Sequence, residues 1–241
     1  MARERVIFHS GPLRLVGELY LPEGEGRRPG IVVIHGLGSR KERHEDFGVA
    51  AAARGFATLI FDMRGHGESE GQLDGRSLDD VAAAVDYLAS RPEVDERRLA
   101  IRGGSMGGHF AVHGAATISV LRACVAICPA PEWLMIDALK QVLSRELPPP
   151  EDYRCDLLDC LTYLRRRDLA AAVRQVAPRP LLLIHDTGDE LIPPSVSEGL
   201  HKAALEPKEL WLIPGGDHAR AAHDPAVNER SLAWLARWLT P

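Results

Sequence analysis

The chain has 241 residues, and its 29 Lys and Arg against 34 Asp and Glu give a formal net charge of −5. A chain of this length buries roughly 70% of its unfolded surface, so a single core needs no disulfide or metal to hold it. The sequence contains no basic run, which argues against nucleic-acid or anionic-membrane partners, because both attract clustered Lys and Arg. We therefore expect one domain that acts on small or neutral molecules.

Four cysteines are too few for a disulfide framework, and their spacing does not match paired zinc ligands. We expect buried free thiols in a reducing compartment. The beginning of the chain, MARERVIF, carries charge without the apolar stretch of a secretory signal. The longest run without Asp, Glu, Lys or Arg, residues 103–121, is interrupted by glycines and histidines and does not predict a membrane span. Together these features predict a soluble, cytoplasmic protein.

Short apolar runs alternate with longer helical patterns along the chain, a rhythm typical of a parallel sheet covered by helices. Residues 6–8 and 14–21 alternate around a Gly-Pro turn and predict an antiparallel hairpin at one sheet edge. Continuously apolar runs predict buried strands at 30–35, 57–62, 99–102, 123–128, 181–185 and 210–213. Helical patterns lie at about 42–54, 77–90, 106–118, 194–204 and 225–239. The fold class is therefore α/β.

One segment interrupts this rhythm. Residues 131–178 have helical periodicity without a convincing strand, and a connection of this length between two core strands is too long for an ordinary loop. We expect a helical cap over the carboxyl edge of the sheet, where open parallel sheets bind their ligands. The predicted organisation is a core of residues 1–130 and 179–241 with the cap inserted at 131–178. Ordinary packing helices on one face of the sheet are the alternative.

The sequence GGSMGG at residues 103–108 lies between a predicted strand and a predicted helix. An abrupt strand-to-helix turn strains the backbone of its central residue, Ser105, and needs glycines so that the chain can pass close by. Such a turn lifts the hydroxyl to the start of a helix whose dipole favours developing negative charge. The pattern predicts that Ser105 is a nucleophile. The alternative is a Gly-rich turn in which Ser105 only caps the helix.

A serine nucleophile requires a base, and the base requires a carboxylate that fixes its tautomer. His218, in the sequence IPGGDH after the last predicted strand, is the candidate base, and His223 is its competitor. Asp189, in the loop after the strand at 181–185, is the candidate acid, and Asp186 is its rival. We read the remaining histidines of interest as ordinary structural residues: His35, His66 and His185 as hydrogen-bonding loop residues, and His109 and His113 as helix-face residues.

Acyl transfer also needs donors for the oxygen that becomes negative in the tetrahedral state. The Met106 amide, at the start of the helix after Ser105, is one candidate. The Leu37 amide, in the sequence HGLG at 35–38, is the other. A simple tight turn between strand and helix is the alternative interpretation of HGLG.

These motifs together resemble those of the α/β-hydrolases, from end to end of the chain. The resemblance rests on HGLG at 35–38, DMRGHGES at 62–69, GGSMGG at 103–108, the loop with Asp189, and GGDH at 215–218. Length, edge hairpin and insertion are similar to those of cinnamoyl and feruloyl esterases and of single-domain relatives of prolyl-oligopeptidase. The resemblance implies an eight-stranded, mostly parallel α/β-hydrolase sheet with helices on both faces, a helical cap, and a serine carboxylesterase without cofactor or metal.

Two residues depart from the family pattern. The acid loop begins His185-Asp186 where His-Gly is usual, and Arg102 stands where an apolar or small residue is common.

The functional hypothesis is the hydrolysis of small to medium acyl esters, because the predicted cap has few aromatic residues beyond Trp133, Tyr153 and Tyr163 and offers little surface for stacking a bulky phenolic acid. A serine thioesterase or peptidase of the same fold and a non-catalytic ligand receptor are alternatives. A metal-dependent hydrolase would draw its ligands from the histidines and acid at the predicted strand ends: His35, His185, Asp186 and His218. The sequence leaves the oligomeric state open.

Overall fold

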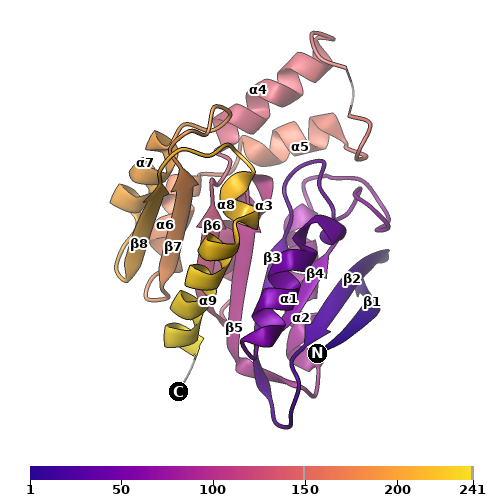
Figure 1. Ribbon diagram of the computed structural model, residues 1–241. Coiled ribbons are helices and arrows are strands. Elements are labelled where there is room, and N and C mark those ends of the chain that lie inside the picture. Colours follow the sequence, from indigo (N-terminus) through magenta and orange to yellow (C-terminus); the bar gives the residue numbers. More distant parts are fainter. Residues whose placement is uncertain (149, 240–241) are drawn as a thin grey trace.

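A computed structural model describes residues 1–148 and 150–239 of the chain. Within these residues, eight strands form one sheet with helices on both faces, which confirms the predicted fold class (Figure 1). Residue 149 of the predicted cap and residues 240–241 of the predicted core lie outside this description. In the same described ranges, no helix has both the length and the apolar character needed to cross a bilayer.

The sheet runs in the spatial order β1-β2-β4-β3-β5-β6-β7-β8. β1 and β2 form the expected antiparallel hairpin, β2 pairs antiparallel with β4, and the remaining neighbours are parallel. The parallel strands therefore end at one common edge. The strands are β1 (Ala2–Ser10), β2 (Leu13–Leu21), β3 (Arg28–Ile34), β4 (Ala57–Phe61), β5 (Val94–Gly104), β6 (Leu121–Ile127), β7 (Leu181–Asp186) and β8 (Lys208–Ile213).

β5 begins five residues before the predicted strand at 99–102. The first half of β5 is polar apart from Val94, which is fully buried. Val94 pairs with Arg28 of β3, and the register of the β3–β5 ladder shifts after this pair. Polar residues on both sides of Val94 mask the strand from any search for continuous apolar runs.

Two groups of helices cover the sheet (Figure 1). One face carries α1 and α9, and the other carries α2, α3, α6 and α7. The helices are α1 (Glu45–Ala53), α2 (Ser77–Ser90), α3 (Met106–Thr117), α4 (Glu132–Leu143), α5 (Leu157–Leu164), α6 (Leu169–Val176), α7 (Ser195–Ala203), α8 (Arg220–His223) and α9 (Pro225–Leu239), with a short 3₁₀ helix at Lys41–His44.

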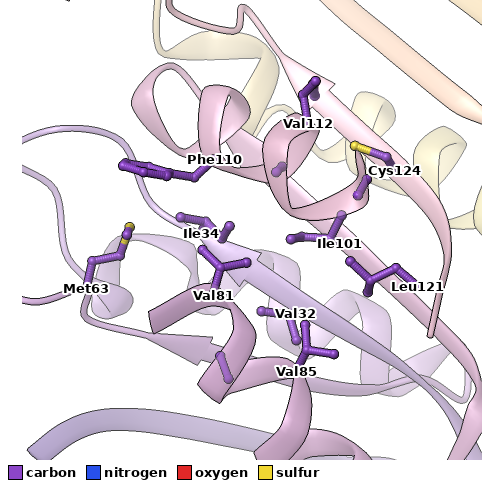
Figure 2. Packing of buried hydrophobic residues seen from close by; sticks show 14 of the residues in the cluster. Val32, Ile34, Met63, Val81, Val85, Ile101, Phe110, Val112, Leu121 and Cys124 are labelled. Carbon is purple, nitrogen blue, oxygen red and sulfur yellow. The ribbon is translucent and has the colours of Figure 1, made fainter. Parts of the chain in front are cut away.

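The core under α3 fixes the helix that follows Ser105. In Figure 2, Val81 of α2 faces Ile34 of β3, while Ile101 of β5 lies under α3. All three side chains are fully buried. Burying apolar side chains contributes about 25 cal/mol per Å² removed from water, so this packing holds α3 against the ends of β3 and β5.

The insertion at 131–178 contains α4, α5 and α6. α4 and α5 lie beyond the carboxyl edge of the sheet (Figure 1), and α4 has no buried residue. α5 packs against α4 and reaches the core cluster with Cys160, Tyr163 and Leu164, whereas α6 packs directly against α3 and buries its apolar face there. We therefore propose that the cap consists of α4, α5 and their connections, and that α6 belongs to the helical layer of the core.

Ile101 provides a test of this packing. We expect Ile101→Ala to lower the free energy of unfolding by about 2–5 kcal/mol, because it leaves a cavity between α3 and the sheet. Urea denaturation measures the change. The matched control is Ile7→Ala, at an exposed position of β1, which should cost less than about 1 kcal/mol. Equal losses at the two positions would contradict the assignment of Ile101 to a tightly packed core.

Candidate active site

Ser105 occupies the turn between β5 and α3 with φ 55° and ψ −122°, in the left-handed region that non-glycine residues avoid. Holding such a conformation costs on the order of 1–3 kcal/mol. Backbone hydrogen bonds hold it: the Ser105 amide donates to the Ile127 carbonyl at 2.9 Å, and the Ser105 carbonyl accepts from the Ala130 amide at 3.0 Å. In the described part of the chain the Ser105 hydroxyl makes no capping bond to α3, so helix capping does not explain this serine.

Glycines flanking Ser105 let three backbones approach each other. A β-carbon at Gly107 would lie 2.2 Å from the Ile34 carbonyl oxygen, and one at Gly103 would lie 2.1 Å from the Gly107 carbonyl oxygen. No side chain fits at such distances. The glycines of GGSMGG therefore permit the tight turn that displays Ser105.

His218 and Asp189 form a hydrogen-bonded pair. The His218 Nδ1 lies 2.7 Å from Asp189 Oδ2, so Nδ1–H donates to the carboxylate and Nε2 is left as the basic nitrogen. The other carboxylate oxygen accepts from the amides of Leu191 at 2.9 Å and Ile192 at 2.8 Å. Burial acts to raise the pKa of Asp189, but the bonds from Ile192 and His218 outweigh it, and the pKa lies below its usual value. The carboxylate is thus ionised and fixed.

The two rival residues have other partners. Asp186 pairs with the Arg220 guanidinium and accepts from the Ala221 amide at 2.7 Å. His223 packs against His44, with ring centroids 5.0 Å apart, and its Nδ1 lies 3.7 Å from Asp46. Among the described residues, neither side chain hydrogen-bonds to the His218–Asp189 pair, although the Asp186 backbone carbonyl accepts the Asp189 amide at 3.2 Å. The geometry therefore favours His218 and Asp189 for the roles that we predict.

Ser105 and His218 lie at the same edge of the sheet. The His218 carbonyl is 3.7 Å from the Cys128 thiol, and Cys128 follows the residue whose carbonyl binds the Ser105 amide. Among the described residues, however, no hydrogen bond joins the Ser105 hydroxyl to His218. The His218–Asp189 hydrogen bond is therefore formed, and the Ser105–His218 hydrogen bond is not. Catalytic hydrogen bonds are often long before substrate binds.

The HGLG turn lies beside Ser105. A β-carbon on Gly36 would lie 3.5 Å from Ser105 Cβ. Within the described ranges the Leu37 amide has no acceptor, and the Met106 amide, as the first of α3, has none inside its helix. Both predicted oxyanion donors are therefore available next to Ser105.

Two neutral histidines support this turn. His35 donates from Nδ1 to the Gly36 carbonyl at 2.8 Å and accepts the Met63 amide at Nε2 at 3.0 Å. His66 accepts the Gly38 amide at 3.3 Å, and its ring stacks on Tyr153 of the insertion at 5.0 Å. Burial lowers the pKa of His35 and lowers the pKa of His66 to about 3, so both rings stay neutral and can accept hydrogen bonds. The role of Tyr153 is not signalled by any local motif.

Arg102, one of the departures from the family pattern, is buried beneath the site. Its guanidinium donates to the Ala222 carbonyl and to Asn228 Oδ1, both at 2.8 Å, and lies 4.0 Å from the Phe47 ring centroid. Burial lowers its pKa to about 10. Arg102 therefore ties the segment after His218 to β5, as Asp186 ties it to β7. Sequence reasoning missed both roles, because their partners lie far away in the chain.

The ligand set considered for a metal-dependent hydrolase does not assemble. His185 bonds Ser197 Oγ at 2.7 Å and the Ile192 carbonyl at 2.9 Å. Asp186 is neutralised by Arg220. Within the described residues, the potential metal-binding groups do not combine His35, His185, Asp186 and His218.

Comparison with known proteins identifies the family. The model of the serine aminopeptidase S33 family matches residues 26–148. The chain belongs to this family of α/β-hydrolases. Over 217 residues it is 32% identical to the uncharacterized protein YfhR of Escherichia coli O157:H7, which covers 88% of this chain and 71% of that protein.

Solved structures agree on the fold. A hypothetical protein of Pseudomonas aeruginosa, PA2218, superimposes with a TM-score of 0.82 at 23% identity, covering 99% of this chain and 94% of that one. Est1E from Butyrivibrio proteoclasticus, solved with bound ferulic acid, superimposes with a TM-score of 0.80 at 21% identity, covering 98% and 100%. These findings confirm the resemblance stated above.

The lowered pKa of Asp189 predicts a pH-dependent contribution to stability. A depressed folded-state pKa stabilises the fold above the unfolded value, near 3.9, and the contribution disappears as pH falls through the folded-state pKa. Asp189→Asn keeps the shape but removes the charge. We expect the wild type to exceed this variant in unfolding free energy above about pH 5 and the gap to narrow below about pH 4, measured by urea denaturation across pH. A gap independent of pH would contradict the charged role.

Proposed function

We propose that this hydrolase is a serine carboxylesterase that cleaves small to medium acyl esters through an acyl-enzyme. The observation that carries the proposal is the strained Ser105 at the start of α3, with the 2.7 Å His218–Asp189 pair at the same sheet edge. Without the His218–Asp189 pair, Ser105 would lack the base that a serine nucleophile needs. Without Ser105, the pair would have no nucleophile to activate. Their common location supports one reaction.

In the proposed reaction, the Ser105 oxygen attacks the ester carbonyl carbon while His218 Nε2 takes its proton. Asp189 keeps the imidazole in the required tautomer and stabilises the imidazolium. The Leu37 and Met106 amides bind the oxyanion, and each such donor is worth about 3–4 kcal/mol of transition-state stabilisation. His218 then protonates the leaving alcohol. A water molecule, activated by the same histidine, releases the acid and restores Ser105.

The surroundings of Ser105 support an uncharged substrate. Apolar side chains are exposed near the proposed machinery: Leu37 of the HGLG turn and Leu191 of the acid loop are 43% and 55% exposed, and Trp133 at the start of the cap is 52% exposed. Exposed apolar side chains of this size favour binding of an apolar acyl chain over binding of a charged substrate. The ferulic acid bound to Est1E makes a carboxylic ester a reasonable substrate class to test here.

The four cysteines are free in the structure. Free thiols are typical of reducing compartments, and we propose a cytoplasmic location on this ground.

Triad variants test the assignment of the nucleophile and base. We expect Ser105→Ala and His218→Ala each to lower kcat/KM for p-nitrophenyl esters by about 10³-fold or more, and Ser105→Ala to leave thermal unfolding unchanged. His223→Ala is the matched control, because this histidine lies five residues away and does not contact Asp189, and it should retain activity. A fluorophosphonate probe should label the wild type and leave Ser105→Ala unlabelled. Turnover that persists in purified Ser105→Ala would overturn the proposal.

The bond that is cleaved needs a separate comparison. A panel of p-nitrophenyl esters, thioesters and aminoacyl amides of matched acyl length should give the highest kcat/KM for the esters of short and medium chains. Preference for thioesters or for aminoacyl amides would reassign the protein to a thioesterase or a peptidase. Saturable binding without probe labelling or turnover would instead indicate a ligand receptor.

A further inference from the structure

A second cluster of functional groups, distinct from the proposed triad, lies between α3 and the start of α4. His109 and His113 are one helical turn apart, and both are buried, at 0% and 5% exposure. Their rings lie side by side, with centroids 4.5 Å apart. Glu132, the first residue of α4, faces both: its Oε1 lies 3.8 Å from His109 Nδ1 and 3.7 Å from His113 Nε2. Nothing in the proposed hydrolysis uses these three residues.

The polar atoms of this cluster lack partners. In the described part of the chain, both ring nitrogens of His109, Nε2 of His113 and Oε1 of Glu132 are buried without a hydrogen bond. The Ala130 carbonyl favours a proton on His109, but it does not reach hydrogen-bonding geometry. Each unsatisfied buried polar group costs about 1–3 kcal/mol, so four in one place require an explanation.

The spacing suits a cation better than direct hydrogen bonds. Gaps of 3.7 and 3.8 Å are too long for an N–H···O bond. Two ligands of a tetrahedral zinc, each about 2.0–2.2 Å from the ion, lie roughly 3.3–3.5 Å from each other. One donor atom from each of the three residues lies within 4.8 Å of the other two. The two carboxylate–imidazole distances exceed this ligand spacing by only a few tenths of an ångström.

We propose that His109, His113 and Glu132 bind a divalent transition-metal ion of the zinc type. Two imidazoles and one carboxylate form a common zinc ligand set, with a fourth position left for water. The ion would satisfy the buried polar atoms that the protein itself leaves unpaired.

Backbone contacts fix the segment that leads into Glu132. The Ala130 amide bonds to the Ser105 carbonyl at 3.0 Å, and Pro129 packs against Gly108, where a β-carbon would lie 3.0 Å from Pro129 Cα. The chain therefore enters α4 along a fixed path over α3. An ion bound here would join the first turn of the proposed cap to the helix that begins after Ser105.

Two further groups belong to the surroundings. The Tyr163 hydroxyl and Arg167 Nε are also buried and unpaired among the described residues, and the guanidinium lies 4.4 Å from the Tyr163 ring centroid. The Arg167 charge disfavours a cation nearby, whereas the Glu132 carboxylate favours it. The other two clusters of possible ligands carry no such proposal: the Lys41 amine already bridges Asp62 and Glu68, and Cys128, His185 and Asp189 lie within the candidate active site.

The test titrates the whole metal-free protein, prepared with a strong chelator, with Co²⁺. We expect one equivalent to give the visible absorption of four-coordinate cobalt and Zn²⁺ to displace it. His113→Ala should abolish the band, and Glu132→Gln, at a partly exposed position less prone to unfolding, should weaken Co²⁺ binding about 10-fold or more. His9→Ala, which removes an exposed histidine of β1, is the matched control and should bind like the wild type.

Thermal unfolding gives a second readout. Zn²⁺ at about 100 times its Kd should raise the Tm of the wild type by about 5–10 °C and leave that of His113→Ala unchanged. Absence of both the cobalt band and the Tm shift in the wild type overturns the proposal, and the cluster is then a hydrated polar pocket. A band that survives in both ligand variants also overturns it. Ser105→Ala should bind the metal normally, so this result is independent of the esterase proposal.

Discussion

The close approach of β3, β5 and α3 is the constraint on which the candidate site depends. At Gly103 and Gly107 the backbones are so near that a β-carbon would overlap a carbonyl oxygen. Only because these positions are side-chain-free can the chain turn from strand to helix within one residue, and that turn places Ser105 at φ 55°. The strain is opposed by hydrogen bonds to Ile127 and Ala130 and by the apolar packing beneath α3. A relaxed Ser105 would no longer project from the sheet edge.

Buried polar contacts position everything else around that serine. Asp62 accepts from the Lys41 amide at 2.8 Å and pairs with its ammonium at 2.9 Å, which joins the DMRGHG turn to the chain after HGLG. A buried ion pair of this kind contributes little net stability, but breaking it is costly because an unpaired charge remains buried. Such contacts fix geometry more than they add free energy. The motif around Asp62 therefore acts as a scaffold for the HGLG turn.

The sequence predicted those features that depend on local patterns. Continuous apolar runs predicted the central strands, and the glycines around Ser105 predicted the turn, because both features depend on residues that are adjacent in the sequence. His218 and Asp189 could be proposed because parallel strands end at one edge, so loop position alone restricts where they lie. Arg102 could not be interpreted, since its partners Ala222 and Asn228 are more than a hundred residues away. Likewise, the periodicity of α6 gives no sign of whether it covers the sheet or the site.

The three residues of the proposed triad are held to different degrees, and the missing hydrogen bond is the one between Ser105 and His218. Asp189 is fixed by two amides and His218, and the loop of His218 is tied through Arg220 and Ala221 to Asp186. The Ser105 hydroxyl can still rotate about one bond, at a cost small beside the strain already held in its backbone. Rotation of the Ser105 hydroxyl therefore disturbs fewer contacts than a movement of His218 or Asp189 would. Because the Met106 amide opens the same helix that carries His109 and His113, an ion bound to those histidines would stiffen the proposed oxyanion donor without touching the reacting atoms.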